Sequence, residues 1–165
     1  MNLTTAQLQT IKADIAANND LNVFPNDSDG NFAIAALYNL LASPDYWVWK
    51  TDATRVSIYN ETSPDGTNWD WTIYKNQSVP EQGAWIQMFM GDRADFSKPN
   101  LRSGIAKIFG SGNANNTHCL AMGRRLAKRI EKLLAAGSGT SGSPSIMAAE
   151  GSITLQQVQA ARELA

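Results

Sequence analysis

The chain has 165 residues, of which 43% are hydrophobic and 18% are charged, and this balance excludes a disordered chain. Its length predicts one soluble domain that buries a core of its own. The first residues, MNLTTAQLQTIKADI, have neither the basic nor the apolar part of a signal peptide, and the sequence has one cysteine (Cys119) and no apolar run near the roughly 20 residues that span a bilayer. We therefore expect no membrane segment, no disulfide and a reducing environment.

The net charge of −1 hides an asymmetry along the sequence. Residues 1–92 carry four basic and eleven acidic residues, a net charge of −7. Residues 93–132 carry nine basic and two acidic residues, a net charge of +7. This pattern predicts either a protein with two oppositely charged faces or copies that attract one another head to tail.

The first two predicted helices have capping signals at their starts. The pair Thr4 and Gln7 forms a capping box before an apolar stripe, which predicts a helix that ends near residues 18–19. The turn at residues 24–31 (FPNDSDGN) offers Asp and Ser side chains that can cap a second helix. The apolar positions of that helix repeat at helical spacing, and Ser43-Pro44 ends it.

The middle of the chain alternates between short elements and turns. The sequence DYWVWKT after Pro44 fits either a short strand or an extended connector, and a short helix is expected over residues 53–60. Asn68 is expected to cap the segment WDWTIYKN. A capping box at Ser78 and Glu81 predicts a helix that stops at Gly91, and a further helix is expected over residues 97–110.

The longest predicted helix covers residues 114–136, about 33 Å at 1.5 Å per residue. Residues 137–144 (GSGTSGSP) are expected to be a flexible linker, and residues 145–165 a docking tail with a short strand and a last helix. Residues 1–136 then form the helical domain. The predicted fold class is mostly α: a compact multi-helix domain with one long helix in its C-terminal half and a short strand/helix tail.

The residues do not suggest catalysis. His118 and Cys119 are adjacent, and neighbouring side chains on a helix diverge by about 100°, so we interpret them as a surface histidine beside a core cysteine. One Cys and one His are too few for a standard zinc site. The glycine-rich segments lack the Lys-Ser/Thr of a phosphate-binding loop. We therefore expect no catalytic residue, no cofactor, no metal site and no enzyme activity.

Two groups of residues are candidates for an interface. The first group is basic: Arg124, Arg125, Lys128, Arg129 and Lys132. It fits nucleic acid or an acidic protein surface, although a solvated face near a helix C-terminus is the alternative and the pI of about 5.8 argues against a dedicated nucleic-acid binder. The second group is aromatic: Trp47, Trp49, Trp69 and Trp71. Such rings stack on sugars or bases, anchor protein interfaces or fill cores, and we expect core positions for most of them and an interface for one or two.

Several segments of the sequence resemble a known family. They are ALYNLLASPDYWVWKT, SVPEQGAWIQMF, KPNLRSGIAKIFGSG, RLAKRIEKLLAAGSGT and PSIMAAEGSITLQQVQAAREL. Together they resemble small virion-associated proteins of tailed bacteriophages, over nearly the whole chain from Leu3 to Ala165. The resemblance carries no motif that assigns a role to a particular residue.

This resemblance implies a non-enzymatic structural protein of the virion, made in the host cytoplasm. A helical chain of this size resembles head-completion or adaptor proteins of the neck, which form a ring between the portal and the tail. The implied partners are further copies of the chain, the portal protein and tail proteins, with sequence-independent contacts to the phosphates of passing DNA. The alternatives are a capsid decoration or other minor virion protein, and a DNA-binding regulator.

Overall fold

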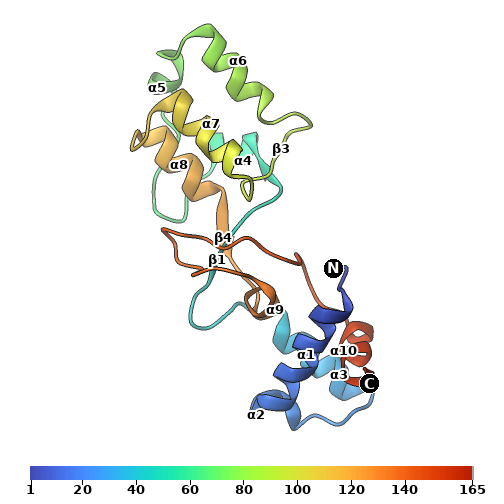
Figure 1. Cartoon of the computed structure of the whole chain (residues 1–165). Helices are drawn as coiled ribbons and strands as arrows, with labels where there is room; N and C mark the ends of the chain where they lie inside the picture. Colours follow the sequence, from blue (N-terminus) through green and yellow to red (C-terminus); the bar gives the residue numbers. More distant parts are fainter. Residues whose placement is uncertain (165) are drawn as a thin grey trace. The chain divides into compact units, whose positions relative to one another are not determined.

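A computed structural model describes residues 1–164 of the chain (Figure 1). About 51% of the chain is helical and 9% is strand, and the described residues form ten helices and two small sheets. The fold is therefore mixed α/β, and the prediction of a mostly α fold is wrong. None of the helices within residues 1–164 is long and apolar enough to cross a membrane.

The chain forms two compact units. Unit 1 contains residues 1–48 and 126–164, and unit 2 contains residues 49–125. The chain passes from one unit to the other within β1 (Trp47–Trp49) and returns within β4 (Arg124–Leu126), and these two strands are paired. These boundaries lie elsewhere than the breaks at residues 136 and 144 that composition suggested.

Unit 1 packs helices around an aliphatic core. Its helices are α1 (Thr5–Ala17), α2 (Asn19–Asn22), α3 (Ser28–Tyr38), α9 (Arg129–Leu134) and α10 (Leu155–Glu163). The core is built mainly from Ile11, Ile15, Leu21, Ile34, Tyr38, Ile130, Ile153 and Val158. Helix α10 packs on α3 and α1, so the C-terminal segment docks on its own unit. Arg162 secures it by donating to the Pro25 carbonyl and to Asn31 Oδ1, each at 2.9 Å.

The predicted helix starts of unit 1 are confirmed. Thr4 Oγ1 accepts from the Gln7 N–H at 3.3 Å, and Gln7 Oε1 accepts from the Thr4 N–H at 2.9 Å. Asp27 Oδ1 caps α3 by accepting from the Gly30 N–H at 2.8 Å. Local side-chain chemistry therefore predicts where these helices begin.

Unit 2 has a core of large aromatic rings. Its elements are β2 (Ala53–Thr54), α4 (Arg55–Asn60), α5 (Trp71–Lys75), α6 (Val79–Gln87), β3 (Arg93–Ala94), α7 (Pro99–Phe109) and α8 (Ala114–Met122). Strands β2 and β3 pair antiparallel, with Ala53 opposite Ala94. The predicted cap of α5 is wrong: Asp70, and not Asn68, accepts from the Thr72 N–H at 2.7 Å.

The prediction of one long helix over residues 114–136 is also wrong. Helix α8 ends at Gly123, where a Cβ atom would lie 2.1 Å from Cδ1 of Phe96, and the Gly123 carbonyl accepts from the Lys50 N–H at 2.8 Å. The chain then runs as β4, and α9 begins where Glu131 Oε2 accepts from the Lys128 N–H at 2.9 Å. Strand pairing and tertiary packing thus replace the middle of the expected helix.

The glycine-rich segment at residues 137–144 packs against Tyr46. The Tyr46 hydroxyl donates to the Gly137 carbonyl at 2.9 Å and lies 2.7 Å from Ser145 Oγ. Gly139 is buried, and a Cβ atom there would lie 2.2 Å from the Tyr46 ring. Glycine lets the backbone approach the ring this closely.

Candidate functional site

The five basic candidates are distributed over two elements and do not line one helix. Arg124 lies in β4 and forms an ion pair with Asp65, and Arg125 follows it in the same strand. Lys128 Nζ donates to Ser152 Oγ at 2.6 Å, and Lys132 Nζ donates to the Pro44 carbonyl at 3.2 Å. Arg129 lies over the Tyr38 ring, with its Cζ 5.6 Å from the ring centroid. Of the five, the structure brings Arg129 and Lys132 together at one cavity.

The net charges of the two units differ less than the net charges of residues 1–92 and 93–132 do. Unit 1 carries five basic and eight acidic residues, a net charge of −3, and unit 2 carries nine basic and seven acidic residues, a net charge of +2. The basic stretch at residues 93–132 is shared between the units, so its charge is not concentrated on either.

The tryptophan candidates differ in exposure. Trp49 and Trp69 are buried in the unit 2 core, with 9% and 8% of their surface exposed, and Trp47 is half-buried. Trp71 is 48% exposed, and its ring centroid lies 4.8 Å from that of Tyr59. Of the four candidates, Trp71 therefore offers the largest exposed fraction to a partner.

His118 is a core residue, so its interpretation as a surface histidine is wrong. The ring is fully buried, with Nε2 2.7 Å from the Ile58 carbonyl and Nδ1 3.1 Å from Thr67 Oγ1. Cys119 is buried as predicted, and burial raises the pKa of its thiol. Both side chains stabilise α8 within the core, and neither is placed for chemistry at the surface.

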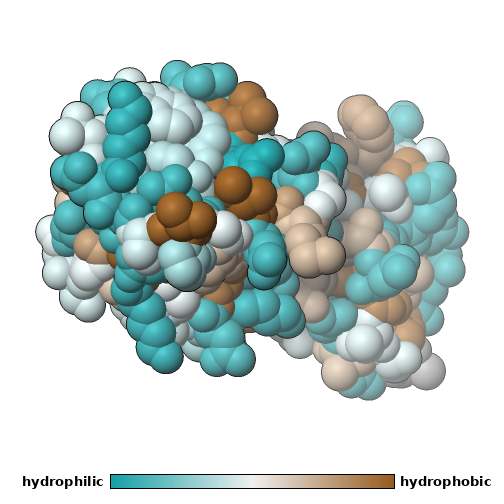
Figure 2. Space-filling model, turned by 90° about the horizontal axis from the view of Figure 1, so that it is seen from above, coloured by the Kyte–Doolittle hydropathy of each residue, from teal (hydrophilic) through white to brown (hydrophobic). Residues whose placement is uncertain are grey.

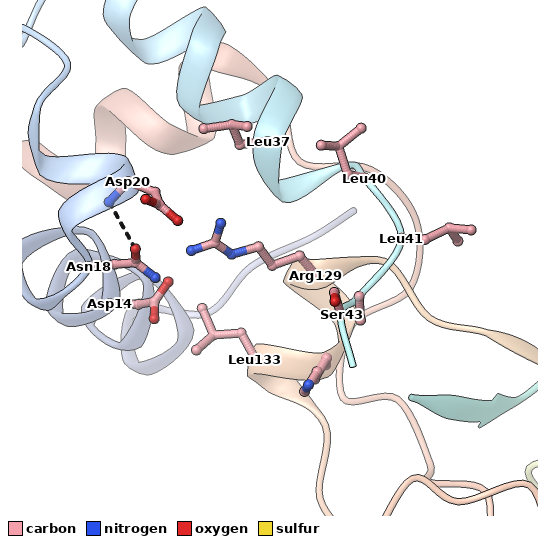
Figure 3. A pocket seen from close by; sticks show the side chains of 11 residues that line it. Asp14, Asn18, Asp20, Leu37, Leu40, Leu41, Ser43, Arg129 and Leu133 are labelled. Atoms are coloured by element: carbon pink, nitrogen blue, oxygen red, sulfur yellow. Dashed lines mark hydrogen bonds between the residues drawn. The ribbon is translucent and has the colours of Figure 1, made fainter. Parts of the chain in front are cut away.

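A cavity of about 500 Å³ opens on unit 1 between α1, α3 and α9, and sequence reasoning missed it (Figure 3). On one side lie Asp14, Asn18 and Asp20. On the other side lie Leu40 and Leu41, which are 59% and 62% exposed. Its volume lies within the range of ligand sites, which is roughly 300–1,000 Å³.

Arg129 lies between these two sides (Figure 3). Among the hydrogen bonds and ion pairs of the described residues, none involves its guanidinium, which leaves its donors available. The Tyr38 hydroxyl donates to Asp14 Oδ2 at 2.7 Å, and burial followed by this bond raises the pKa of Tyr38. Arg129 therefore lies between the acidic side chains and Leu40 and Leu41, and Leu37, Lys132 and Leu133 also line the cavity.

Unit 2 exposes apolar side chains on α6 and on the turn that follows it. Val79 and Ile86 lie in α6 and are 82% and 48% exposed, and Met90, in the turn that follows this helix, is 82% exposed. Figure 2 shows brown hydrophobic atoms at the surface among teal polar side chains. Exposed apolar groups gathered on one face mark surfaces that bind partners.

The cavity and the exposed apolar side chains are candidate binding surfaces. No group of three or more His, Cys, Asp or Glu residues within the described chain is placed to hold a metal ion. The cavity could hold an apolar group next to a carboxylate, because guanidinium groups bind carboxylates with paired hydrogen bonds.

Comparisons of the chain with protein-family models, curated proteins and solved structures find no match.

Proposed function

We propose that the chain is a non-enzymatic structural protein of a tailed-bacteriophage virion, which acts as a head-to-tail adaptor in a ring between the portal and the tail. The observation that carries the proposal is that each unit exposes its own apolar surface. Leu40 and Leu41 border the cavity of unit 1, and Val79, Ile86 and Met90 are exposed on α6 and the turn after it in unit 2.

Two such surfaces suit a protein that joins partners. A chain that binds one partner needs one interface, whereas a ring component must also contact its neighbouring copies. The quoted sequence segments, within residues 3–165, resemble virion-associated proteins of tailed bacteriophages, and this resemblance supplies the virion context. DNA passing through such a ring would be contacted at its phosphates by exposed cations, independently of sequence.

A complemented knockout tests this function. A phage with an amber codon early in this gene should produce DNA-filled heads and complete tails that do not join, and the chain supplied from a plasmid should restore joined particles. Electron microscopy of the lysates distinguishes the outcomes. Joined, infectious particles without the chain would refute the adaptor function, and joined but fragile heads would favour a capsid decoration protein instead.

A further inference from the structure

One turn of unit 2 is built to project a side chain outward. Residues 89–92, here called the Met90 turn, connect α6 to β3 and stand out from the helices of their unit in Figure 1. Phe89 anchors the turn in the core with 3% of its surface exposed, whereas Met90 is 82% exposed. The Asp92 N–H donates to the Phe89 carbonyl at 2.9 Å, and β3 continues directly into its pairing with β2. A turn held at both ends binds with a small entropic cost.

The Met90 turn presents three kinds of group in sequence order. Met90 is apolar, the Asp92 side chain is 82% exposed, and the neighbouring Arg93 is also exposed. Asp92 lies 3.9 Å from Arg55, a separation typical of a weak surface ion pair that is readily exchanged.

The cavity of unit 1 presents groups that are complementary to those of the turn. Its leucines suit a methionine side chain, its Arg129 guanidinium suits the carboxylate of Asp92, and Asp14 and Asp20 suit the guanidinium of Arg93. Complementary charge steers a partner to such a site and favours one orientation.

We infer that the Met90 turn of one copy inserts into the unit 1 cavity of a second copy, with Met90 against Leu40 and Leu41 and with Asp92 paired to Arg129. This contact is heterologous, since each copy contributes a turn on one side and a cavity on the other. Repetition of such a contact closes a ring or extends a filament. The inference deepens the proposed adaptor function, on which it rests, by naming the contact between copies.

Met90→Asp is the first test, because the side chain is exposed and its replacement leaves the core unchanged. Analytical ultracentrifugation over a concentration series should show self-association of the wild-type chain, weakened at least tenfold by Met90→Asp. Val56→Asp changes another exposed apolar residue of unit 2, which is 61% exposed, and should associate as the wild type does. Equal association of Met90→Asp and the wild type would overturn the inference.

A charge exchange identifies the partner as a second copy. Asp92→Arg and Arg129→Asp should each associate at least tenfold more weakly than the wild type, and an equimolar mixture of the two should recover association. The mixture pairs an Asp92 turn with an Arg129 cavity and an Arg turn with an Asp cavity. Circular dichroism checks the fold of each variant. Asp92→Asn serves as a milder second variant, because asparagine tolerates the positive φ of 62° at this position, and it too should weaken association.

The outcomes separate this contact from the adaptor function. A folded pair of variants whose mixture fails to associate would overturn the contact, as would a wild-type chain that stays monomeric. Association by this contact alongside normal head–tail joining in the knockout would confirm the contact and refute the adaptor function.

Discussion

The two units differ in which side chains they pack into the core and which they leave at the surface. In unit 2 the tryptophans, which are typical of binding sites, are mostly packed into the core: Trp69 and Trp85 stack with ring centroids 5.2 Å apart. In unit 1 the core is mainly aliphatic, and the surface cavity is lined by leucines, acidic residues, Arg129 and Lys132. The difference teaches that the environment of a side chain, and not its type, identifies a candidate binding surface.

The largest expected effect concerns the independence of the two cores. Trp85 is fully buried and donates from Nε1 to the Tyr59 hydroxyl at 2.7 Å, so Trp85→Ala should cost about 3–5 kcal/mol of stability in unit 2. Hydrogen exchange measured by mass spectrometry should show lost protection in α6, α7 and α8, while α1, α3 and α10 stay protected.

Ile34→Ala is the matched variant in unit 1, where a fully buried isoleucine is truncated at a cost of about 2–5 kcal/mol. It should expose α3 and α10 first. Uniform loss of protection over the whole chain in both variants would contradict two separately packed units.

The next largest loss of stability is expected from replacing a buried carboxylate of unit 1. Glu131 is fully buried, and its two oxygens accept from the N–H groups of Lys128 and Gly151, each at 2.9 Å. Glu131→Ala leaves both donors unsatisfied and should cost about 3 kcal/mol in urea unfolding. Glu131→Gln keeps one acceptor and should cost less; equal stability of Glu131→Ala and the wild type would show that the carboxylate does not hold this segment.

Removing a helix cap of unit 1 should lower the stability by a smaller amount. Thr154 Oγ1 accepts from the Gln157 N–H at 3.3 Å at the start of α10. Thr154→Ala should lower the free energy of unfolding by about 1 kcal/mol, whereas Thr154→Ser should preserve it. Both values come from urea unfolding, and an unchanged midpoint for Thr154→Ala would rule out a stabilising cap.

The smallest expected effect is the pH dependence of one helix start, which differs between capping boxes of the two units. The boxes of α1 and α10 in unit 1 use glutamine, whereas α6 in unit 2 uses Glu81, whose pKa is lowered by hydrogen bonds from the Ser78 hydroxyl and N–H. A lowered pKa means that the contribution is present above the ordinary glutamate value of about 4.5 and is lost as the pH falls through the folded value. Protection at the start of α6 should therefore decrease in acid, and Glu81→Gln should remove this dependence. An equal acid response of α10 would contradict the assignment.

Much of the local structure could be predicted from the sequence. The boxes at Thr4, Ser78 and Thr154 and the stop at Gly110 are confirmed, because a helix end depends on a few neighbouring side chains. The break at Gly123 could not be predicted from its neighbours, since it depends on Phe96 and on a backbone bond from Lys50. The burial of His118 likewise depends on Thr67 and Ile58, which lie 51 and 60 residues away.

The candidate site was predicted only in part. Arg129 and Lys132 were singled out for their charge, and both line the cavity. The remaining sides come from residues 14–20 and 37–43, whose proximity to α9 is a tertiary feature that no local pattern signals. The prediction that the helix continues to Ser43-Pro44 is wrong, because α3 ends at Tyr38 and leaves Leu40 and Leu41 exposed in the segment after it.

The most direct measurement of the central claim is the copy number of the chain in purified virions, determined by mass spectrometry with calibrated peptides. A ring at the neck predicts roughly a dozen copies per particle, because closed cyclic symmetry fixes a small number of subunits. Hundreds of copies per particle, or complete absence from the virion, would contradict a head-to-tail adaptor.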